Sequence, residues 1–335
     1  PAYKEDKVII PAIYSFLQQD YPRELYDIIV ISDQMQESTN EALRQLPVRL
    51  LIADYTDSSK AKAMSLAMNA TADIPYDAVV IMDADNTAGT SFLSELNPVF
   101  QSGARAVQAH RTAKNTNTDI AVLDAASEEI NNSIFRSGHI ALGLSSALIG
   151  SGMALEACWF RQHIHLLETA GEDKEMEALL LKQRIHIEYL EHVYVKDEKT
   201  QKKEGIKNQR KRWIAAQFDS LVRALPDFPK ELLRGNIDYC DKVFQWTLLP
   251  RIILIFCTFF FTILVTLVSP YSSIKWWILA FALFLALFTA IPGHLLNKQL
   301  LRAIFQLPSL LLGIASNLFK LKGVNKKFIH TEHGN

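Results

Sequence analysis

The chain has 335 residues, 49% of them hydrophobic, and a formal net charge of −1 at neutral pH. This length accommodates a domain of ordinary size and further segments. The near-neutral balance gives no global argument for a nucleic-acid partner, because lysine and arginine cluster only locally. The three cysteines, Cys158, Cys240 and Cys257, have no paired or metal-ligand spacing, which is typical of structural thiols in a reducing compartment.

The first third of the chain alternates between helical and strand patterns. Helical spacing of apolar residues predicts helices over 7–19, 38–45 and 58–71. Short apolar, β-branched runs predict strands over 28–32, 48–53 and 78–82. Such alternation predicts an α/β fold with a doubly wound, mostly parallel, Rossmann-like sheet. The opening residues, 1–6, look like a loop that follows a strand, so we expect the first strand to be missing.

Aspartates follow two of these predicted strands. Asp33 ends the run 28–32, and Asp83 and Asp85 follow the run 78–82. Ligands of open α/β sheets bind beyond the carboxyl ends of the strands. Carboxylate oxygens there suit magnesium or manganese shared with substrate phosphates. Acids at strand ends are also ordinary loop residues, so this spacing needs support from the rest of the chain.

Beyond residue 108 the alternation gives way to a long predicted helix, 119–135, and a stretch of small residues. Gly150 and Gly152 within that stretch allow the backbone to approach a ligand closely, although a plain turn explains them as well. Glu172 and Asp173 stand where the next helix begins, a place that favours acids through the helix dipole alone.

A basic stretch, 196–212, ends in the residues Q-R-K-R-W. Basic residues near a membrane commonly contact anionic headgroups. Arg212 beside Trp213 equally suits a pyrophosphate, because guanidinium groups pair bidentately with phosphate oxygens. The local sequence leaves both interpretations open.

Two uncharged runs, 252–268 and 276–291, reach about 20 residues each with their flanks, which is the length that crosses a bilayer. They predict transmembrane helices at about 248–268 and 276–296. A catalytic domain over 1–235 would then be followed by a membrane region over 243–320.

The charges flanking these runs fit a catalytic domain in the cytoplasm. Arg251, Lys298 and Arg302 fall on the inner side and only Lys275 falls outside, as the positive-inside tendency expects. A third apolar stretch, about 303–319, has a weakly polar stripe that favours an interfacial or re-entrant helix. The basic tail, 321–335, would then stay beside the catalytic domain. Three crossings with an external tail is the alternative.

Several short motifs occur here in the order found in the membrane-bound branch of the family 2 glycosyltransferases. They are P-A-Y-K-E at the start, Asp33 after I-I-V-I-S, Lys62 in K-A-M-S-L-A-M-N, D-A-D, G-E-D and Q-R-K-R-W, with apolar helices following. The chain resembles this branch over nearly its whole length. The branch includes cellulose, hyaluronan and poly-N-acetylglucosamine synthases and ceramide glucosyltransferase.

The resemblance implies a GT-A fold that binds a nucleotide-sugar, usually a UDP-sugar, together with Mg²⁺ or Mn²⁺. Carried over by position, it assigns the uridine to Ala2, Tyr3, Glu5 and Asp33. It assigns the nucleotide portion to Lys62, the nucleotide-sugar to Asp83, and the metal on the diphosphate to Asp85. The family often has Gly-Asn after the lysine-alanine pair, where this chain has Met64 and Ser65, so the lysine assignment is the weakest.

The resemblance also assigns the general base to Asp173, and it places Gln209, Arg212 and Trp213 near the diphosphate and the acceptor. In an inverting transfer a carboxylate takes the proton of the attacking hydroxyl, a contribution of typically 10²–10⁴-fold. Cationic groups stabilise the charge that grows on the leaving diphosphate.

The implied protein is an integral membrane enzyme of the bacterial inner membrane that builds surface polysaccharide or glycolipid. Its acceptor is a saccharide or a lipid, and partner subunits are possible. Transfer of a single sugar to a lipid is the nearest alternative, because ceramide-type enzymes share the Q-x-x-R-W motif. A membrane-anchored, inactive nucleotide-sugar-binding subunit is the alternative from another class, and a complete set of acids and Arg212 argues against it.

Overall fold

The computed structural model describes residues 1–169, 171–201, 203–305 and 307. The chain begins with a parallel sheet in the order β1-β2-β3. Its strands are β1 (Ala2–Tyr3), β2 (Ile29–Asp33) and β3 (Arg49–Ala53). The helices around it are α1 (Ile9–Leu17), α2 (Glu37–Arg44) and α3 (Lys60–Ala70).

The sheet is covered on both faces because neighbouring residues of a strand point in opposite directions. Val30 of β2 packs with Ile13 of α1 and Leu43 of α2. The next residue, Ile31, packs with Ala63 of α3 on the other face. This alternation explains why the strand reads as an unbroken apolar run, and it confirms the predicted doubly wound arrangement for this part of the chain.

A second sheet has the strand order β4-β7-β6-β8-β5. Its strands are β4 (Ala78–Ile81), β5 (Thr87–Ala88), β6 (Ala106–Ala113), β7 (Met153–Glu156) and β8 (Ile187–Asp197). Only β6 and β8 pair in parallel, whereas β4 with β7, β6 with β7 and β5 with β8 are antiparallel. The expectation of a mostly parallel sheet therefore describes the first sheet, and the second sheet is mixed.

Helices cover this second sheet and build the largest core of the molecule. They are α4 (Phe92–Gln101), α5 (Asp119–Asn132), α6 (Gly138–Ala141), α7 (Ala157–His163), α8 (Glu172–Lys182), α9 (Lys203–Ala224), α10 (Phe228–Leu233) and α11 (Ile237–Thr247). A π-helical turn, Ser133–Ser137, joins α5 to α6. Trp159 of α7, Leu180 of α8 and Ile187 of β8 share the core, which fixes α8 against the sheet.

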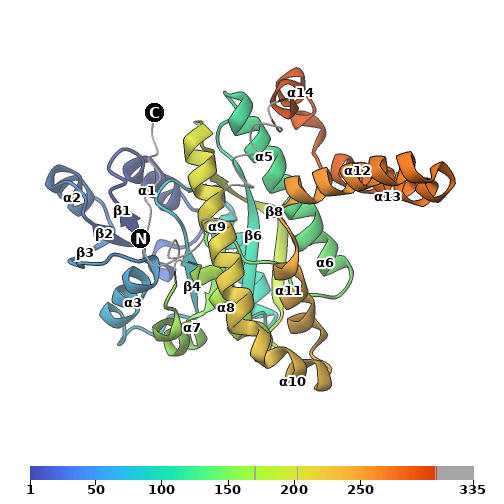
Figure 1. Ribbon diagram of the computed structural model, residues 1–335. Helices are drawn as coiled ribbons and strands as arrows, with labels where there is room; N and C mark the ends of the chain where they lie inside the picture. The colour runs from blue at the N-terminus through green and yellow to red at the C-terminus, as the bar shows by residue number, and fades with distance from the viewer. Residues whose placement is uncertain (170, 202, 306, 308–335) are drawn as a thin grey trace.

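Two apolar helices project from the domain as a hairpin (Figure 1). They are α12 (Arg251–Val268) and α13 (Pro270–Thr289), with 18 and 20 residues. At 1.5 Å per residue they are roughly 27 and 30 Å long, enough for the hydrocarbon core of a bilayer. Only 11% of each apolar window is buried, so length, composition and exposure make both helices candidate membrane spans.

The chain returns from the hairpin to the domain through α14 (Lys298–Ile304). Leu295 and Leu300 pack against Val122 and Ala126 of α5. At the other end of the hairpin, Arg251 donates to the side-chain oxygen of Asn131, also on α5. Both ends of the hairpin are therefore held on one helix. Most of the third predicted helix, 303–319, and the tail, 321–335, lie outside the described residues.

Candidate active site

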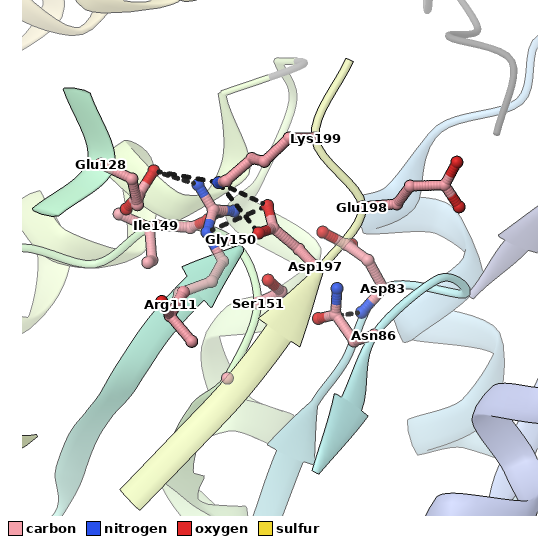
Figure 2. A network of polar contacts seen from close by, with 12 residues as sticks. Asp83, Asn86, Arg111, Glu128, Ile149, Gly150, Ser151, Asp197, Glu198 and Lys199 are labelled. Carbon is pink, nitrogen blue, oxygen red and sulfur yellow. Dashed lines mark hydrogen bonds and ion pairs between the residues drawn. The ribbon is translucent and has the colours of Figure 1, made fainter. Parts of the chain in front are cut away.

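The turn after β4 holds two aspartates in place through the buried side chain of Asn86. Its Oδ1 accepts a hydrogen bond from the backbone N of Asp83 (3.2 Å), and its Nδ2 donates to Oδ1 of Asp85 (3.1 Å). Oδ2 of Asp85 accepts from the backbone N of Glu198, just beyond β8 (3.0 Å). The ends of β4 and β8 therefore meet at this turn, and Asp83 and Asn86 lie beside the end of β8 in Figure 2.

Lys60, the first residue of α3, pairs with Asp83. Its Nζ lies 2.5 Å from Oδ1 of Asp83, donates to the carbonyl of Gly150 (2.7 Å) and lies 3.6 Å from Oε1 of Glu172. Burial disfavours the charged lysine, but Asp83 and Glu172 outweigh burial and raise the pKa of Lys60. Burial also disfavours the carboxylate of Asp83, and Lys60 reverses this, so the pKa of Asp83 is lowered. The pair stays ionised and connects the strand-end acids to the start of α8.

The first turn of α8 carries the acids of the G-E-D motif. Glu172 is buried, and burial, opposed by Lys60 and reinforced by Asp173, raises its pKa to about 7. Asp173 is partly exposed, and its Oδ1 accepts from the backbone N of Lys174 (2.9 Å). Gly150 closes one side of this cluster with φ at +79°, and a Cβ there would lie 3.8 Å from Oε1 of Glu172. The backbone conformation and the nearby cluster therefore both favour glycine at this position.

Helix α9 brings the Q-x-x-R-W motif to the same place. Gly171, the residue before α8, lies so close to α9 that a Cβ on it would be 2.8 Å from Cβ of Ala216. Burial lowers the pKa of Arg212, while the negative charges of Glu172, Asp83 and Asp173 oppose the shift. Arg212 therefore lies within electrostatic reach of Asp83, Glu172 and Asp173.

Two neighbours of Arg212 complete this part of the site. Oε1 of Gln209 is buried and has no hydrogen-bond partner among the described residues. Trp213 lies under the guanidinium of Arg210, whose carbon is 4.9 Å from the ring centroid. Arg210 also donates to Oδ1 of Asp124 on α5 (2.8 Å), which fixes the rotation of α9.

The residues predicted to hold a nucleoside gather at the ends of β1 and β2. Ala2 and Asp33 are buried, and Tyr3 pairs with Asp33 in the sheet register. Oδ1 of Asp33 is buried without a hydrogen-bond partner in the described part of the chain. Burial, with Asp85 and Asp83 next in effect, raises the pKa of Glu5 to about 8. The ends of β1 and β2 therefore carry a buried acceptor atom that has no hydrogen-bond partner among the described residues.

Lys62 is not brought into this cluster. Its Nζ donates to the backbone carbonyl of Asp57 (2.7 Å) and lies 5.8 Å from the ring centroid of Tyr55, on the exposed side of α3. Lys60, two residues earlier, occupies the place beside Asp83. Because successive α-helical residues are about 100° apart around the axis, only one of these two lysines can face the sheet ends.

A buried ionic network lies directly behind the site (Figure 2). Arg111 of β6 lies 3.0 Å from Oε2 of Glu128 and donates to the carbonyl of Ile149 (3.2 Å). Lys199 lies 2.9 Å from Asp197 at the end of β8. Burial opposes the charge of Arg111, but Glu128 and Asp197 outweigh burial and raise its pKa. The network holds β6, β8 and the loop before Gly150 in one fixed arrangement.

The acids around Asp85 fit a divalent cation that is shared with a substrate. No group of three or more metal-ligating side chains converges within the described residues, so a cage made by protein alone is not present there. Magnesium is usually held by one or two carboxylates together with substrate phosphates. Burial, Asp85 and Asp83 all disfavour the charged form of Glu5, and a divalent ion held by Asp85 would reduce this repulsion between neighbouring acids.

Sequence reasoning missed Lys60, Asn86, Glu198 and the network around Arg111. Asn86 was visible as the residue that follows D-A-D, because a buried amide is the natural partner of two neighbouring carboxylates. The other three left no local signal, since each acts on a residue at least 17 positions away.

Comparison with known proteins identifies the class. The model of the family described as glycosyltransferase-like family 2 matches residues 1–216, and the chain belongs to this family. No curated protein matches the sequence.

Solved structures of other proteins are similar to this chain. The mannosyltransferase PcManGT from Pyrobaculum calidifontis, in complex with GDP-Man and Mn²⁺, is similar with a TM-score of 0.54 and 16% identity, over 96% of this chain and 86% of that one. S. aureus TarS 1–349 in complex with UDP gives a TM-score of 0.43 and 13% identity, over 66% of this chain and 64% of that one. Its complex with UDP-GlcNAc gives 0.48 and 12%, over 97% and 88%. The family and the similarity to the mannosyltransferase show that the fold is GT-A-like.

Proposed function

We propose that the protein is an inverting, metal-dependent glycosyltransferase that moves a sugar from a UDP-sugar to a saccharide or lipid acceptor at the cytoplasmic face of a bacterial inner membrane. One observation carries the proposal. Lys60 pairs with Asp83 after β4 and lies near Glu172 at the start of α8, and Arg212 of α9 is under the charge of the same two acids, although these residues are far apart in the sequence.

The donor lies across the carboxyl ends of the strands in this proposal. Ala2, Tyr3, Glu5 and Asp33 hold the nucleoside, and the unpartnered Oδ1 of Asp33 accepts a hydrogen bond from it. Asp83 contacts the sugar end. Lys60 takes the place beside the diphosphate that the sequence motif gave to Lys62.

The transfer itself needs one base and stabilisation of one leaving group. The acceptor oxygen attacks the anomeric carbon, Asp173 takes the hydroxyl proton, and the bond to the diphosphate oxygen breaks on the opposite face. Arg212 and Lys60 stabilise the negative charge of the departing nucleoside diphosphate. Gln209 and Trp213 position the diphosphate and the acceptor.

Asp85 is the residue proposed to hold Mg²⁺ or Mn²⁺. The bound ion would supply Lewis-acid neutralisation of the diphosphate. The mannosyltransferase with 16% identity contains Mn²⁺ and GDP-Man, which supports a divalent ion and a nucleotide-sugar in this fold. The hydrogen bonds from Asn86 and Glu198 fix the carboxylate of Asp85, the group that would hold the ion.

Attachment to a membrane by α12 and α13 belongs to the same proposal. Their lengths fit a bilayer, and Arg251 and Lys298 flank them on the side of the catalytic domain. The two candidate spans among the described residues offer no enclosed path for a polymer by themselves, so single transfer to a lipid acceptor is the second candidate within this proposal.

The test measures UDP release from a panel of UDP-sugars in detergent with Mn²⁺ or Mg²⁺. Asp173→Asn is expected to lower kcat by about 10²–10⁴-fold while UDP binding persists, because the amide cannot take a proton. Glu172→Gln is the matched comparison from the same helical turn, and it should keep most of kcat. Loss of turnover in Glu172→Gln with an active Asp173→Asn would move the base to Glu172. Failure of the unaltered chain to bind UDP would reject the donor assignment.

A further inference from the structure

A buried ion pair outside the proposed active site joins α8 to α11. Nζ of Lys242 on α11 lies 2.9 Å from Oε1 of Glu177 on α8, and both side chains are only 2% exposed. Lys242 also donates to Oε1 of Gln245 within the same helix (3.1 Å). Replacing a buried ion pair by apolar side chains of similar volume is often neutral or stabilising. Stability alone is therefore a weak explanation for these two charges.

Glu177 also holds the main chain of the loop that precedes β7. The atom that pairs with Lys242, Oε1, accepts a hydrogen bond from the backbone N of Leu148 (3.1 Å). Leu148 is buried, so loss of this acceptor would leave an unpaired N–H away from water. The carboxylate therefore anchors the loop on α8, and the charge of Lys242 compensates the buried carboxylate.

The loop, residues 148–151, continues from this anchor into the site. The carbonyls of its next three residues accept hydrogen bonds from side chains of β6 and α3. The pairs are Ile149 with Arg111 (3.2 Å), Gly150 with Lys60 (2.7 Å) and Ser151 with Gln108 (3.0 Å). The hydrogen bond from Leu148 adds α8 to these anchors, and α8 is the helix that begins with Glu172 and Asp173.

The loop lies against the first turn of α8 beside Asp173. A Cβ on Gly150 would be 4.0 Å from Cβ of Asp173. Asp173 and Glu177 are four residues apart, so they share one face of α8. That face meets the loop twice, at Gly150 and at Leu148. A shift of Leu148 on Glu177 would therefore change the space between Gly150 and the carboxylate of Asp173.

We propose that Glu177, paired with Lys242, is a positioning residue that sets the distance between the loop 148–151 and Asp173. This inference rests on the function proposed above, in which Asp173 takes the proton of the acceptor hydroxyl. A misplacement of about 1 Å at the reacting atoms lowers turnover by roughly 10²-fold. Glu177 acts through the backbone of Leu148, and Lys242 acts through Glu177.

The pair should affect turnover more than donor binding. The residues proposed to hold the nucleoside lie at the ends of β1 and β2, which belong to the other sheet. The contacts of Glu177 and Lys242 lie on the loop before β7 and on α11. Loss of the anchor should therefore lower kcat and leave UDP affinity unchanged.

The test compares two double variants of the full chain in detergent. One combines Glu177→Gln with Lys242→Met, and the other combines Glu177→Met with Lys242→Met. Both remove the two charges together, so neither variant leaves a buried ion without its partner. Only glutamine keeps a side-chain oxygen that can accept from the backbone N of Leu148. The contrast isolates this one hydrogen bond.

The measurements are UDP affinity, UDP release from the preferred donor and the midpoint of thermal unfolding. The variant with methionine at both positions should lose at least about tenfold in kcat with unchanged UDP affinity. The variant with glutamine should recover most of kcat. Hydrogen exchange of the segment 145–152 should be faster in the first variant than in the second, because the amide of Leu148 loses its acceptor.

A third double variant covers failure of the apolar pair to fold. Glu177→Asn with Lys242→Met keeps the amide but shortens its reach by one methylene group. It should lower kcat with UDP affinity retained, and full turnover in this variant would overturn the inference.

The remaining outcomes separate this inference from the proposed function. Equal turnover in the glutamine and methionine variants overturns the positioning role alone, because the hydrogen bond to Leu148 then makes no difference to the reaction. Parallel losses of UDP affinity, kcat and thermal midpoint in both variants show that the pair only stabilises the fold, which also overturns it. Absence of UDP release by the folded, unaltered chain rejects the proposed function, and the positioning role falls with it.

Discussion

The clearest consequence of the structure concerns two lysines on the same helix. Lys60 lies between Asp83 and Glu172, whereas Lys62 points to the carbonyl of Asp57 outside the site. Replacing either lysine by methionine removes one charge from the first turn of α3 and keeps an unbranched side chain. The pair Lys60→Met and Lys62→Met therefore isolates the effect of position.

The expected magnitudes differ because the environments differ. Breaking a buried ion pair costs about 3–5 kcal/mol, which we reduce to about 2–3 kcal/mol because the side chain of Asp83 is 38% exposed. Loss of a preorganised positive charge near the leaving group lowers kcat by about 10²–10³-fold. Lys62→Met removes an exposed side chain, so stability should change by less than about 0.5 kcal/mol and turnover by less than about twofold.

The assay combines the midpoint of thermal unfolding in detergent, UDP affinity and UDP release from the preferred donor. Lys60→Met should lower all three, and Lys62→Met should resemble the unaltered chain. Loss of turnover in Lys62→Met with a normal Lys60→Met would refute the reasoning and restore the lysine chosen from the motif.

Three further predictions use other parts of the molecule. Glu128→Gln leaves Arg111 and Arg136 without their shared buried carboxylate. It should lower the free energy of unfolding, measured by chemical denaturation, by about 3–5 kcal/mol. An unchanged denaturation midpoint would show that the network does not stabilise the fold. Chelation of divalent ions should stop UDP release, and adding Mn²⁺ or Mg²⁺ should restore it. Asp85→Asn should lower the affinity for the metal, so that a higher metal concentration is needed for the same rate. Full activity in the presence of chelator would exclude a role for the metal. His139 donates a hydrogen bond to the carboxylate of Asp241, which raises the pKa of His139, and the same bond, working against burial, lowers the pKa of Asp241. The pair should therefore stabilise the fold most at pH values between the ordinary pKa of an aspartate and that of a histidine. This stabilisation should decline as the pH rises through the raised pKa of His139 or falls through the lowered pKa of Asp241. Asp241→Asn should remove about 1 kcal/mol of this pH dependence of unfolding, and an unchanged pH profile would contradict the prediction.

Most elements in the first third of the chain follow from local patterns. The predicted helices over 7–19, 38–45 and 58–71 correspond to α1, α2 and α3, and the three predicted strands correspond to β2, β3 and β4. The long helix over 119–135 starts at Asp119 as expected, and its last residues form the π-helical turn. The second apolar helix starts at Pro270, earlier than the predicted 276, because a proline is tolerated in the first turn.

The strands β6, β7 and β8 were not recognised in the sequence. β7 has four residues within a run of small side chains, and β8 alternates irregularly where a register shift occurs between Ala109 and His110 of its partner. Short strands in mixed sheets are stabilised by neighbours that are distant in the chain, and periodicity carries little of that information.

The sequence by itself determined the family, the acids at the ends of β2 and β4, the acids at the start of α8, and the apolar hairpin. Each of these depends on composition or on residues within one turn or one strand. Only the tertiary structure decided that Lys60 rather than Lys62 meets Asp83, that Asn86 and Glu198 fix Asp85, and that Arg111 of β6 pairs with Glu128 of α5 behind the site. These depend on which residues meet across β4, β8, α3 and α9, because contacts between distant segments are set by packing of the whole domain and leave no periodic pattern in the chain.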